Sequence, residues 1–215
     1  MSEAAEVVSS ARALLLDFDG PITGLMPPPL NAQAAEQARL ALQEIPLPDE
    51  IATTTDHLAV LHFAAAHRPD RYSSVERACS EAEIDCARRS QPSPEAQALF
   101  EDAQRRSVPV AVVSNNSAYA VREFLHRFSW AAAGRVFACR TPEVGARLKP
   151  DPFLVQRAIA LLRVHSDDCI FVGDSVSDVQ AGNAAGVRVV GLAKTPERGR
   201  QLLAAGAVAL IERAP

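Results

Sequence analysis

The chain has 215 residues, of which 48% are hydrophobic, so it is long enough for one globular domain of ordinary size and a modest insertion. Its formal charge of -4 comes from acidic and basic residues mixed along the chain, and without a Lys- or Arg-rich run nucleic acid is not expected as a partner. The first ten residues are acidic where a signal peptide needs positive charge, and charges or prolines interrupt every apolar stretch before the roughly 18 residues of a membrane span, so we expect a cytoplasmic protein with no membrane association.

The first predicted strand ends in two negative charges. Residues 11–18 read ARALLLDF, and a turn-forming Gly-Pro pair follows, so Asp17 and Asp19 stand at the end of a buried strand. A carboxylate costs several kcal/mol to desolvate unless it is paired or binds a metal. Taken alone, this stretch fits a strand that runs out into solvent as well as it fits a strand that ends in a functional site.

A helical segment follows the first strand. Residues 30–90 contain almost no β-type run and instead predict alanine-rich helices at about 30–45, 49–67 and 73–89. The proline-containing stretches MPPPL and SQPSP flank this segment as hinges would. The pattern predicts a helical insertion, of the size of a small cap, after the first strand.

Short β-rich runs alternate with amphipathic helical stretches from residue 93 onward. The predicted strands lie at 108–114, 135–139, 169–174 and 187–192. Their continuous apolar character suits strands of a parallel sheet that is covered on both faces. The sequence therefore predicts an α/β fold in which a parallel sheet carries helices on both faces.

Polar residues gather at the predicted carboxyl ends of these strands, where ligands bind in open parallel sheets. The candidates are Asp17, Asp19, Ser114, Lys149, Asp174 and Asp178. Four converging carboxylates would repel one another strongly without a divalent cation, and oxygen ligands without a nearby cysteine or histidine favour Mg²⁺. The lysine and the serine hydroxyl are suited to hold the outer oxygens of a phosphoryl group. One carboxylate can then attack phosphorus while a second, two residues along, transfers the proton.

Four ordered motifs carry a resemblance to a known family. They are DFDG at the end of the first strand, VVSNN at 112–116, LKPDP at 148–152 and FVGDSVSDVQAGNAAG at 171–186. In this order they resemble the motifs of the haloacid dehalogenase (HAD) superfamily, and the insertion resembles the C1 cap of its phosphoglycolate phosphatase and β-phosphoglucomutase-like branch. The resemblance implies a discontinuous Rossmann-like catalytic core, residues 1–23 and 92–215, with an inserted helical cap domain at 24–91.

The same resemblance implies a role for each candidate residue. It makes Asp17 the nucleophile and Asp19 the general acid/base. The implied phosphate-binding residues are Ser114, Asn115 and Lys149. The implied Mg²⁺ ligands are the Asp17 carboxylate, the Asp19 carbonyl and Asp174, with Asp178 supporting the lysine or the metal. The implied activity is that of a HAD-like phosphoric monoester hydrolase, a Mg²⁺-dependent phosphatase that acts on a small phosphorylated metabolite through an aspartyl phosphate.

Pro21 departs from the pattern of the family, which usually places threonine or valine two residues after the second aspartate. Proline removes one backbone donor and fixes φ near about −65°. The carbonyl expected on the metal belongs to Asp19 and is retained, so we expect activity to persist with an altered loop geometry.

Three alternative functions fit some of the same residues. A β-phosphoglucomutase-like phosphoryl transferase shares the core motifs and differs in how well the cap excludes water. A non-catalytic regulatory member of the family is the second alternative, and Pro21 is the one feature in its favour. A phosphoacceptor receiver domain also combines acidic pairs, a hydroxyl residue and a lysine, but that class needs no helical cap and would not carry GDSVSD after the lysine.

Overall fold

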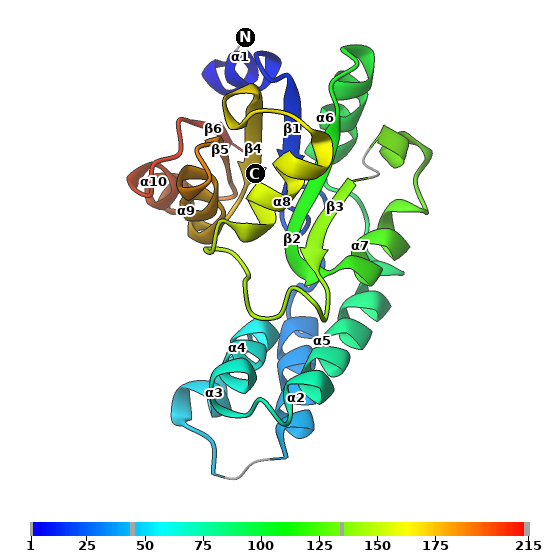
Figure 1. Ribbon diagram of the computed structural model, residues 1–215, viewed down its shortest axis with the longest axis vertical. Helices are drawn as coiled ribbons and strands as arrows, with labels where there is room; N and C mark the ends of the chain where they lie inside the picture. The colour runs from blue at the N-terminus through cyan, green and yellow to red at the C-terminus, as the bar shows by residue number, and fades with distance from the viewer. Residues whose placement is uncertain (1, 44–45, 134–135, 213–215) are drawn as a thin grey trace.

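A parallel β-sheet forms the centre of the protein. The structure, a computed structural model, describes residues 2–43, 46–133 and 136–212. Within these residues the strands are β1 (Ala13–Leu16), β2 (Val110–Ser117), β3 (Val136–Arg140), β4 (Cys169–Gly173), β5 (Arg188–Ala193) and β6 (Ala209–Glu212). They lie in the order β3-β2-β1-β4-β5-β6, so β1 stands between β2 and β4 (Figure 1). The predicted α/β fold with a parallel sheet is confirmed.

Helices cover both faces of this sheet. They are α1 (Glu3–Ser9), α6 (Pro94–Arg105), α7 (Ala118–Leu125), α8 (Phe153–Leu162), α9 (Val176–Ala184) and α10 (Pro196–Ala204), with short 3-10 helices η1 (Ser129–Ala133) and η2 (Ser166–Asp168). Leu14 and Leu16 of β1 belong to a core shared with α1, α6 and α7, whereas Leu15 belongs to the core shared with α8, α9 and α10. Because both faces of the strands are buried, their apolar character is continuous rather than alternating.

Further helices lie beyond the carboxyl ends of β1, β2 and β3 (Figure 1). They are α2 (Leu30–Leu42), α3 (Asp49–Thr53), α4 (His57–His67) and α5 (Tyr72–Ala87), which we call the α2–α5 segment. Helix α2 packs against α4 and α5, and α5 also contacts α7 and β2. The loops that follow the strands therefore lie at the junction between the sheet and the α2–α5 segment.

The helix predicted over 49–67 is two helices. Thr54 has extended backbone angles, φ −62° and ψ 144°, which end α3. Asp56 then starts α4, because its side chain accepts a hydrogen bond of 2.8 Å from the amide of Leu58. An aspartate two residues before an apolar run is a helix start signal, so the break was readable from the sequence.

Other element boundaries differ by a few residues. The helix predicted over 30–45 ends at Leu42, because Gln43 adopts the left-handed conformation, and residues 44 and 45 lie outside the described residues. Residue 135 of the strand predicted at 135–139 also lies outside them. No prediction covered α1 and β6, which have seven and four residues and are too short to show a clear periodicity.

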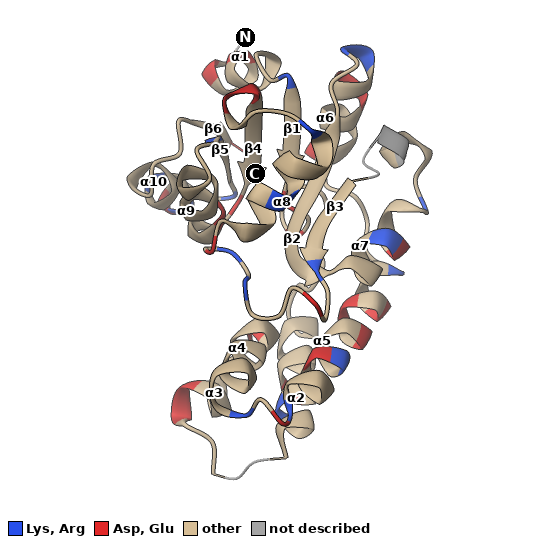
Figure 2. Cartoon of the chain, viewed as in Figure 1, with Lys and Arg blue, Asp and Glu red and all other residues tan. Residues whose placement is uncertain are grey.

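Charges of both signs are interspersed over the fold (Figure 2). No described helix combines the length and the apolar character that crossing a lipid bilayer requires.

Candidate active site

A pocket of about 520 Å³ lies between the strand ends and the α2–α5 segment. The predicted site residues all line it: Asp17, Asp19, Ser114, Asn115, Lys149, Asp174 and Asp178. They come from the ends of β1, β2 and β4, from the start of α9 and from the loop before α8. The structure thus brings together residues that are up to 161 positions apart, and their individual roles remain predictions.

Asp17 is a buried carboxylate that continues β1. Its amide donates to the carbonyl of Val172 at 2.9 Å, so the pairing with β4 extends to this residue. Its Oδ1 accepts hydrogen bonds from Lys149 Nζ at 2.7 Å and from the amide of Phe18 at 2.8 Å. Two donors on one oxygen fix the plane of the carboxylate, and Oδ2 has no such donor among the described residues.

Lys149 stands between two carboxylates. Its Nζ lies 2.7 Å from Asp17 Oδ1 and 2.7 Å from Asp178 Oδ1. Burial lowers the pKa of Lys149, but the two carboxylates raise it by more, so the ammonium group stays charged. Asn115 holds the backbone of the lysine, since its Oδ1 accepts from the Lys149 amide at 2.8 Å and its Nδ2 donates to the Lys149 carbonyl at 2.9 Å. Asn115 is therefore placed to position the lysine.

Asp178 caps a helix and also belongs to the site. Its Oδ2 accepts from the amides of Asp174 and Ser175 at 3.1 and 3.0 Å, while the Ser175 side chain accepts from the Asp178 amide at 3.2 Å. This reciprocal capping box starts α9. Because Oδ1 pairs with Lys149, one fully buried carboxylate fixes both the helix start and the lysine.

Three carboxylates converge closely enough to hold a metal ion. Asp17, Asp174 and Asp178 each offer an oxygen, and these oxygens lie within 4.8 Å of one another. Burial, followed by the charges of Asp178 and Asp174, raises the pKa of Asp17 despite the nearby lysine. Burial likewise raises the pKa of Asp174, although Lys194 lies 2.7 Å away and lowers it. A divalent cation would relieve this repulsion, and the all-oxygen donor set fits Mg²⁺.

Asp19 lies in the turn that follows Asp17. Its Oδ1 accepts a hydrogen bond from the amide of Leu25 at 2.9 Å. Burial raises the pKa of Asp19, and this hydrogen bond lowers it by less, so the pKa is raised on balance. In the same turn the carbonyl of Phe18 accepts from the amide of Thr23, and the carbonyl of Pro21 accepts from a serine hydroxyl. Two hydrogen bonds therefore hold the turn that contains Pro21, one from the Thr23 amide and one from the hydroxyl of Ser93, which lies just after the α2–α5 segment.

Gly20 fits against a candidate metal ligand. It has φ +118°, and a Cβ at this position would lie 2.2 Å from Asp174 Oδ2. We expect Gly20→Ala to lower the free energy of unfolding by about 1–3 kcal/mol, because the backbone is strained and the carboxylate must move. Urea denaturation measures this loss. Gly24→Ala is the control, since a Cβ there meets no atom within 4 Å, and equal losses in the two variants would contradict the prediction.

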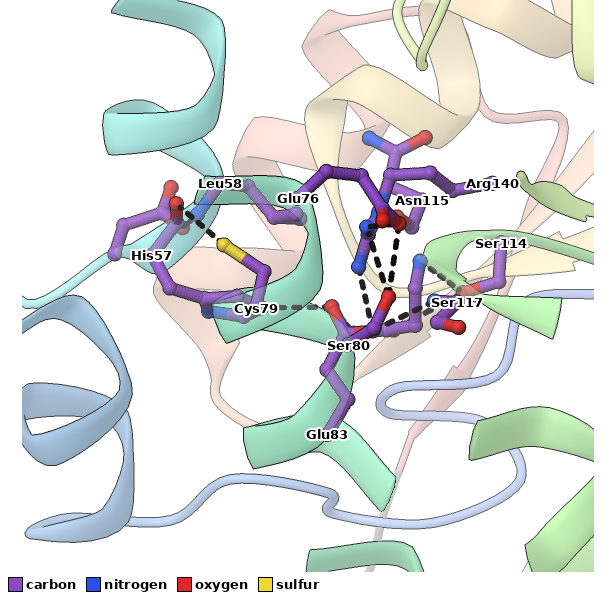
Figure 3. A network of polar contacts seen from close by, with 12 residues as sticks. His57, Leu58, Glu76, Cys79, Ser80, Glu83, Ser114, Asn115, Ser117 and Arg140 are labelled. Atoms are coloured by element: carbon purple, nitrogen blue, oxygen red, sulfur yellow. Dashed lines mark hydrogen bonds and ion pairs between the residues drawn. The ribbon is translucent and has the colours of Figure 1, made fainter. Parts of the chain in front are cut away.

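A buried ion-pair network lies behind the pocket and joins α5 to the core (Figure 3). Glu83 Oε2 lies 2.6 Å from Arg140 Nη2 and accepts from the amide of Ser117 at 2.7 Å. Its Oε1 lies 2.8 Å from His57 Nε2. Burial raises the pKa of Glu83, but the guanidinium of Arg140 and the hydrogen bond to His57 lower it by more, to about 2. Both Glu83 and Arg140 have no exposed surface, so this network is part of the core.

The pocket contains residues that were not predicted. The sheet side adds Ser175, Ser177 and Lys194, and the helical side adds Met26, Pro27, Asn31, Thr55, Asp56, His57 and Leu58. Lys194 directly follows β5, so the reasoning from strand ends could have found it. The residues of the helical side depend on how the α2–α5 segment sits over the sheet, and no local pattern marks them.

Comparison with known proteins agrees with this arrangement. A family model described as haloacid dehalogenase-like hydrolase matches residues 11–186. A phosphoglycolate phosphatase from Xylella fastidiosa is 24% identical over 179 residues, which cover 82% of this chain and 77% of that protein. An N-acetylmuramic acid 6-phosphate phosphatase from Pseudomonas aeruginosa is 26% identical over 184 residues, covering 82% and 79%.

Solved structures share the fold. CbbY from Rhodobacter sphaeroides, in complex with phosphate, superposes with a TM-score of 0.72 at 22% identity, over 94% of this chain and 93% of that chain. A putative β-phosphoglucomutase from Thermotoga maritima superposes with a TM-score of 0.60 at 19% identity, over 93% and 94%. Since the family model spans most of the sequence and the pocket gathers its four motifs, the chain belongs to the haloacid dehalogenase-like hydrolase family.

Proposed function

We propose that this hydrolase is a Mg²⁺-dependent phosphatase that cleaves a small phosphorylated metabolite through an aspartyl phosphate on Asp17. The observation that carries the proposal is the buried carboxylate of Asp17, held by Lys149 inside a converging acidic cluster at one end of a pocket. The relatives named as phosphatases support the same reaction class.

Hydrolysis through an aspartyl phosphate takes two displacements at phosphorus, and the residues of the pocket can carry out both. Asp17 Oδ2 attacks phosphorus as the ester bond breaks, and Asp19 gives a proton to the departing oxygen. Asp19 then takes a proton from a water molecule, whose oxygen attacks phosphorus and releases phosphate from Asp17. Lys149 and the Ser114 hydroxyl bind the phosphoryl oxygens throughout. Mg²⁺ held by Asp17, Asp174 and the Asp19 carbonyl would neutralise the charge of those oxygens.

The α2–α5 segment would serve as the cap of this site. Under this proposal residues 24–91 form the cap, and residues 1–23 and 92–215 form the catalytic core. The position of the α2–α5 segment at the carboxyl ends of the strands supports the assignment (Figure 1). A cap in this place would exclude water from the first displacement and contact the leaving group of the substrate.

Chelation of the metal tests the proposal. Purified protein is assayed for phosphate release from p-nitrophenyl phosphate and from a panel of sugar monophosphates, with Mg²⁺ and with EDTA. We expect EDTA to lower the rate by at least about tenfold and excess Mg²⁺ to restore it, because the carboxylate cluster needs a cation to accept an anionic substrate. An isomerised sugar phosphate without release of phosphate would instead favour the mutase.

A further inference from the structure

The helical side of the pocket faces the part of the substrate that leaves. Under the proposed function Asp17 and Lys149 hold the phosphoryl end at the strand ends, so the remaining volume of the pocket is left for the leaving group. This side is lined by Met26, Pro27, Asn31, Thr55, Asp56, His57 and Leu58. A pocket of about 520 Å³ has room for a phosphoryl group and a small polyol or sugar.

Cations in this pocket are confined to the phosphoryl end. Among the lining residues that the structure describes, the lysines are Lys149 and Lys194, and both belong to the sheet side. Lys149 is paired with Asp17 at 2.7 Å, and Lys194 with Asp174 at 2.7 Å. The helical side contributes a negative charge, the exposed Asp56. A second anionic group on the substrate would therefore be repelled by the carboxylate of Asp56, and among the described residues that line this side no lysine or arginine would bind it.

The buried network behind the helical side supplies no spare positive charge. Arg140 is fully buried, and its guanidinium donates to Glu76 Oε1 at 2.5 Å and to Glu83 Oε2 at 2.6 Å (Figure 3). His57 lines the pocket, and its Nε2 lies 2.8 Å from Glu83 Oε1. Even with a protonated histidine, the two cations are balanced by the two glutamates. The network therefore carries no net positive charge, and it would not attract an anionic leaving group.

Neutral polar groups are available on the same side. Asn31 lines the pocket with a neutral amide side chain, and Thr55 adds a hydroxyl. Uncharged amide and hydroxyl groups can exchange hydrogen bonds with the hydroxyl groups of a substrate. Both residues thus suit a hydroxylated leaving group without a charge.

We propose that the substrate is a monophosphate ester of a neutral hydroxylated compound, and that Asp56 disfavours substrates with a carboxylate or a second phosphate. The inference rests on the proposed phosphatase function and narrows it. It separates this protein from both named relatives, because phosphoglycolate and N-acetylmuramic acid 6-phosphate each carry a carboxylate.

Substrate pairs in which one member carries a second anionic group test the inference. One pair is 2-hydroxyethyl phosphate and 2-phosphoglycolate, and the other is fructose 6-phosphate and fructose 1,6-bisphosphate. With Mg²⁺ at fixed ionic strength, we expect kcat/KM for the neutral member to exceed that for its anionic partner by at least about tenfold. A ratio of one or below in both pairs would overturn the inference.

Asp56→Asn removes the charge of this residue while keeping its role as the cap of α4. Asparagine also caps helices well, so α4 keeps its start. We expect the variant to raise kcat/KM for the anionic member relative to its neutral partner by at least about threefold in each pair. Asp49→Asn, an exposed acidic residue of α3 that does not line the pocket, is the matched control and should leave this ratio unchanged. Equal changes in kcat/KM for both members of a pair would show that Asp56 does not discriminate between substrates by their charge.

The outcomes also separate this inference from the proposal on which it rests. Turnover of p-nitrophenyl phosphate with Mg²⁺, together with a preference for 2-phosphoglycolate, would overturn the inference and leave the phosphatase standing. A folded protein that releases phosphate from none of these compounds would overturn both.

Discussion

Asp17→Asn is expected to lower kcat for phosphate release by at least about 10⁴-fold, because an amide does not replace the attacking carboxylate. The substitution keeps the size of the side chain and its contact with the Phe18 amide. Lys149 loses one of its two carboxylate partners but keeps Asp178 at 2.7 Å, so the variant should fold. The loss therefore reports chemistry, and steady-state phosphate release with Mg²⁺ measures it.

Asp151→Asn provides the matched control for this result. Asp151 is an exposed aspartate in the loop that carries Lys149, and its side chain accepts a hydrogen bond of 2.8 Å from the amide of Phe153. We expect kcat within about twofold of the unmodified protein, as for most surface substitutions. If Asp17→Asn kept more than a hundredth of the activity while melting as the parent does, Asp17 would not be the nucleophile.

The core of the site was predictable because a parallel sheet places the ends of its strands at one edge. Short apolar runs located β1, β2 and β4, and the polar residues at their carboxyl ends, such as Asp17, Ser114 and Asp174, then had to lie close together. No long-range information was needed for this step. The exact hydrogen bonds were beyond it, since Asp178 could be read as a helix cap or as a site residue and the structure shows both.

The helical side was less predictable for a physical reason. Its residues reach the pocket only through the packing of α2, α4 and α5 on one another and on the core, which one-dimensional periodicity does not encode. One signal was nevertheless present. Glu76, Ser80 and Glu83 recur at spacings of four and three, which puts polar groups on one face of α5 beside buried Val75 and Cys79. A polar row on a buried helix face indicates a partner, here Arg140.

Arg140 ties the α2–α5 segment to the carboxyl end of β2, which carries the candidate phosphate ligands. Arg140 Nε donates to the carbonyl of Asn115 at 3.0 Å, and the same guanidinium pairs with Glu83 of α5. Glu83 in turn accepts from the amide of Ser117 and from Asn116 Nδ2 at 3.2 Å. The backbone around the candidate phosphate ligands thus depends on a carboxylate that a distant helix supplies (Figure 3).

Glu83→Gln is expected to lower the free energy of unfolding at pH 7 by about 3 kcal/mol. Each pKa unit is worth about 1.4 kcal/mol, so a carboxyl with a pKa of about 2 instead of 4.5 stabilises the folded state by about this amount. Loss of one partner from a buried ion pair costs a similar amount, because Arg140 would stay buried with less compensation. Urea denaturation gives the difference, and Asp85→Asn, an exposed ion-pair residue of the same helix, should cost less than about 1 kcal/mol.

The pH dependence of this difference identifies the charge of Glu83 as its source. The pKa of the carboxyl is lowered in the folded state, so its contribution is complete above about pH 4.5 and is lost as the pH falls toward 2. The gap between the parent and Glu83→Gln should therefore shrink to about half or less of its size as the pH falls from 7 to 3. A gap that stays constant from pH 7 to pH 3 would assign the loss to packing or to the hydrogen bonds from Ser117 and Asn116. It would then exclude the ion pair with Arg140 as the link between α5 and the carboxyl end of β2.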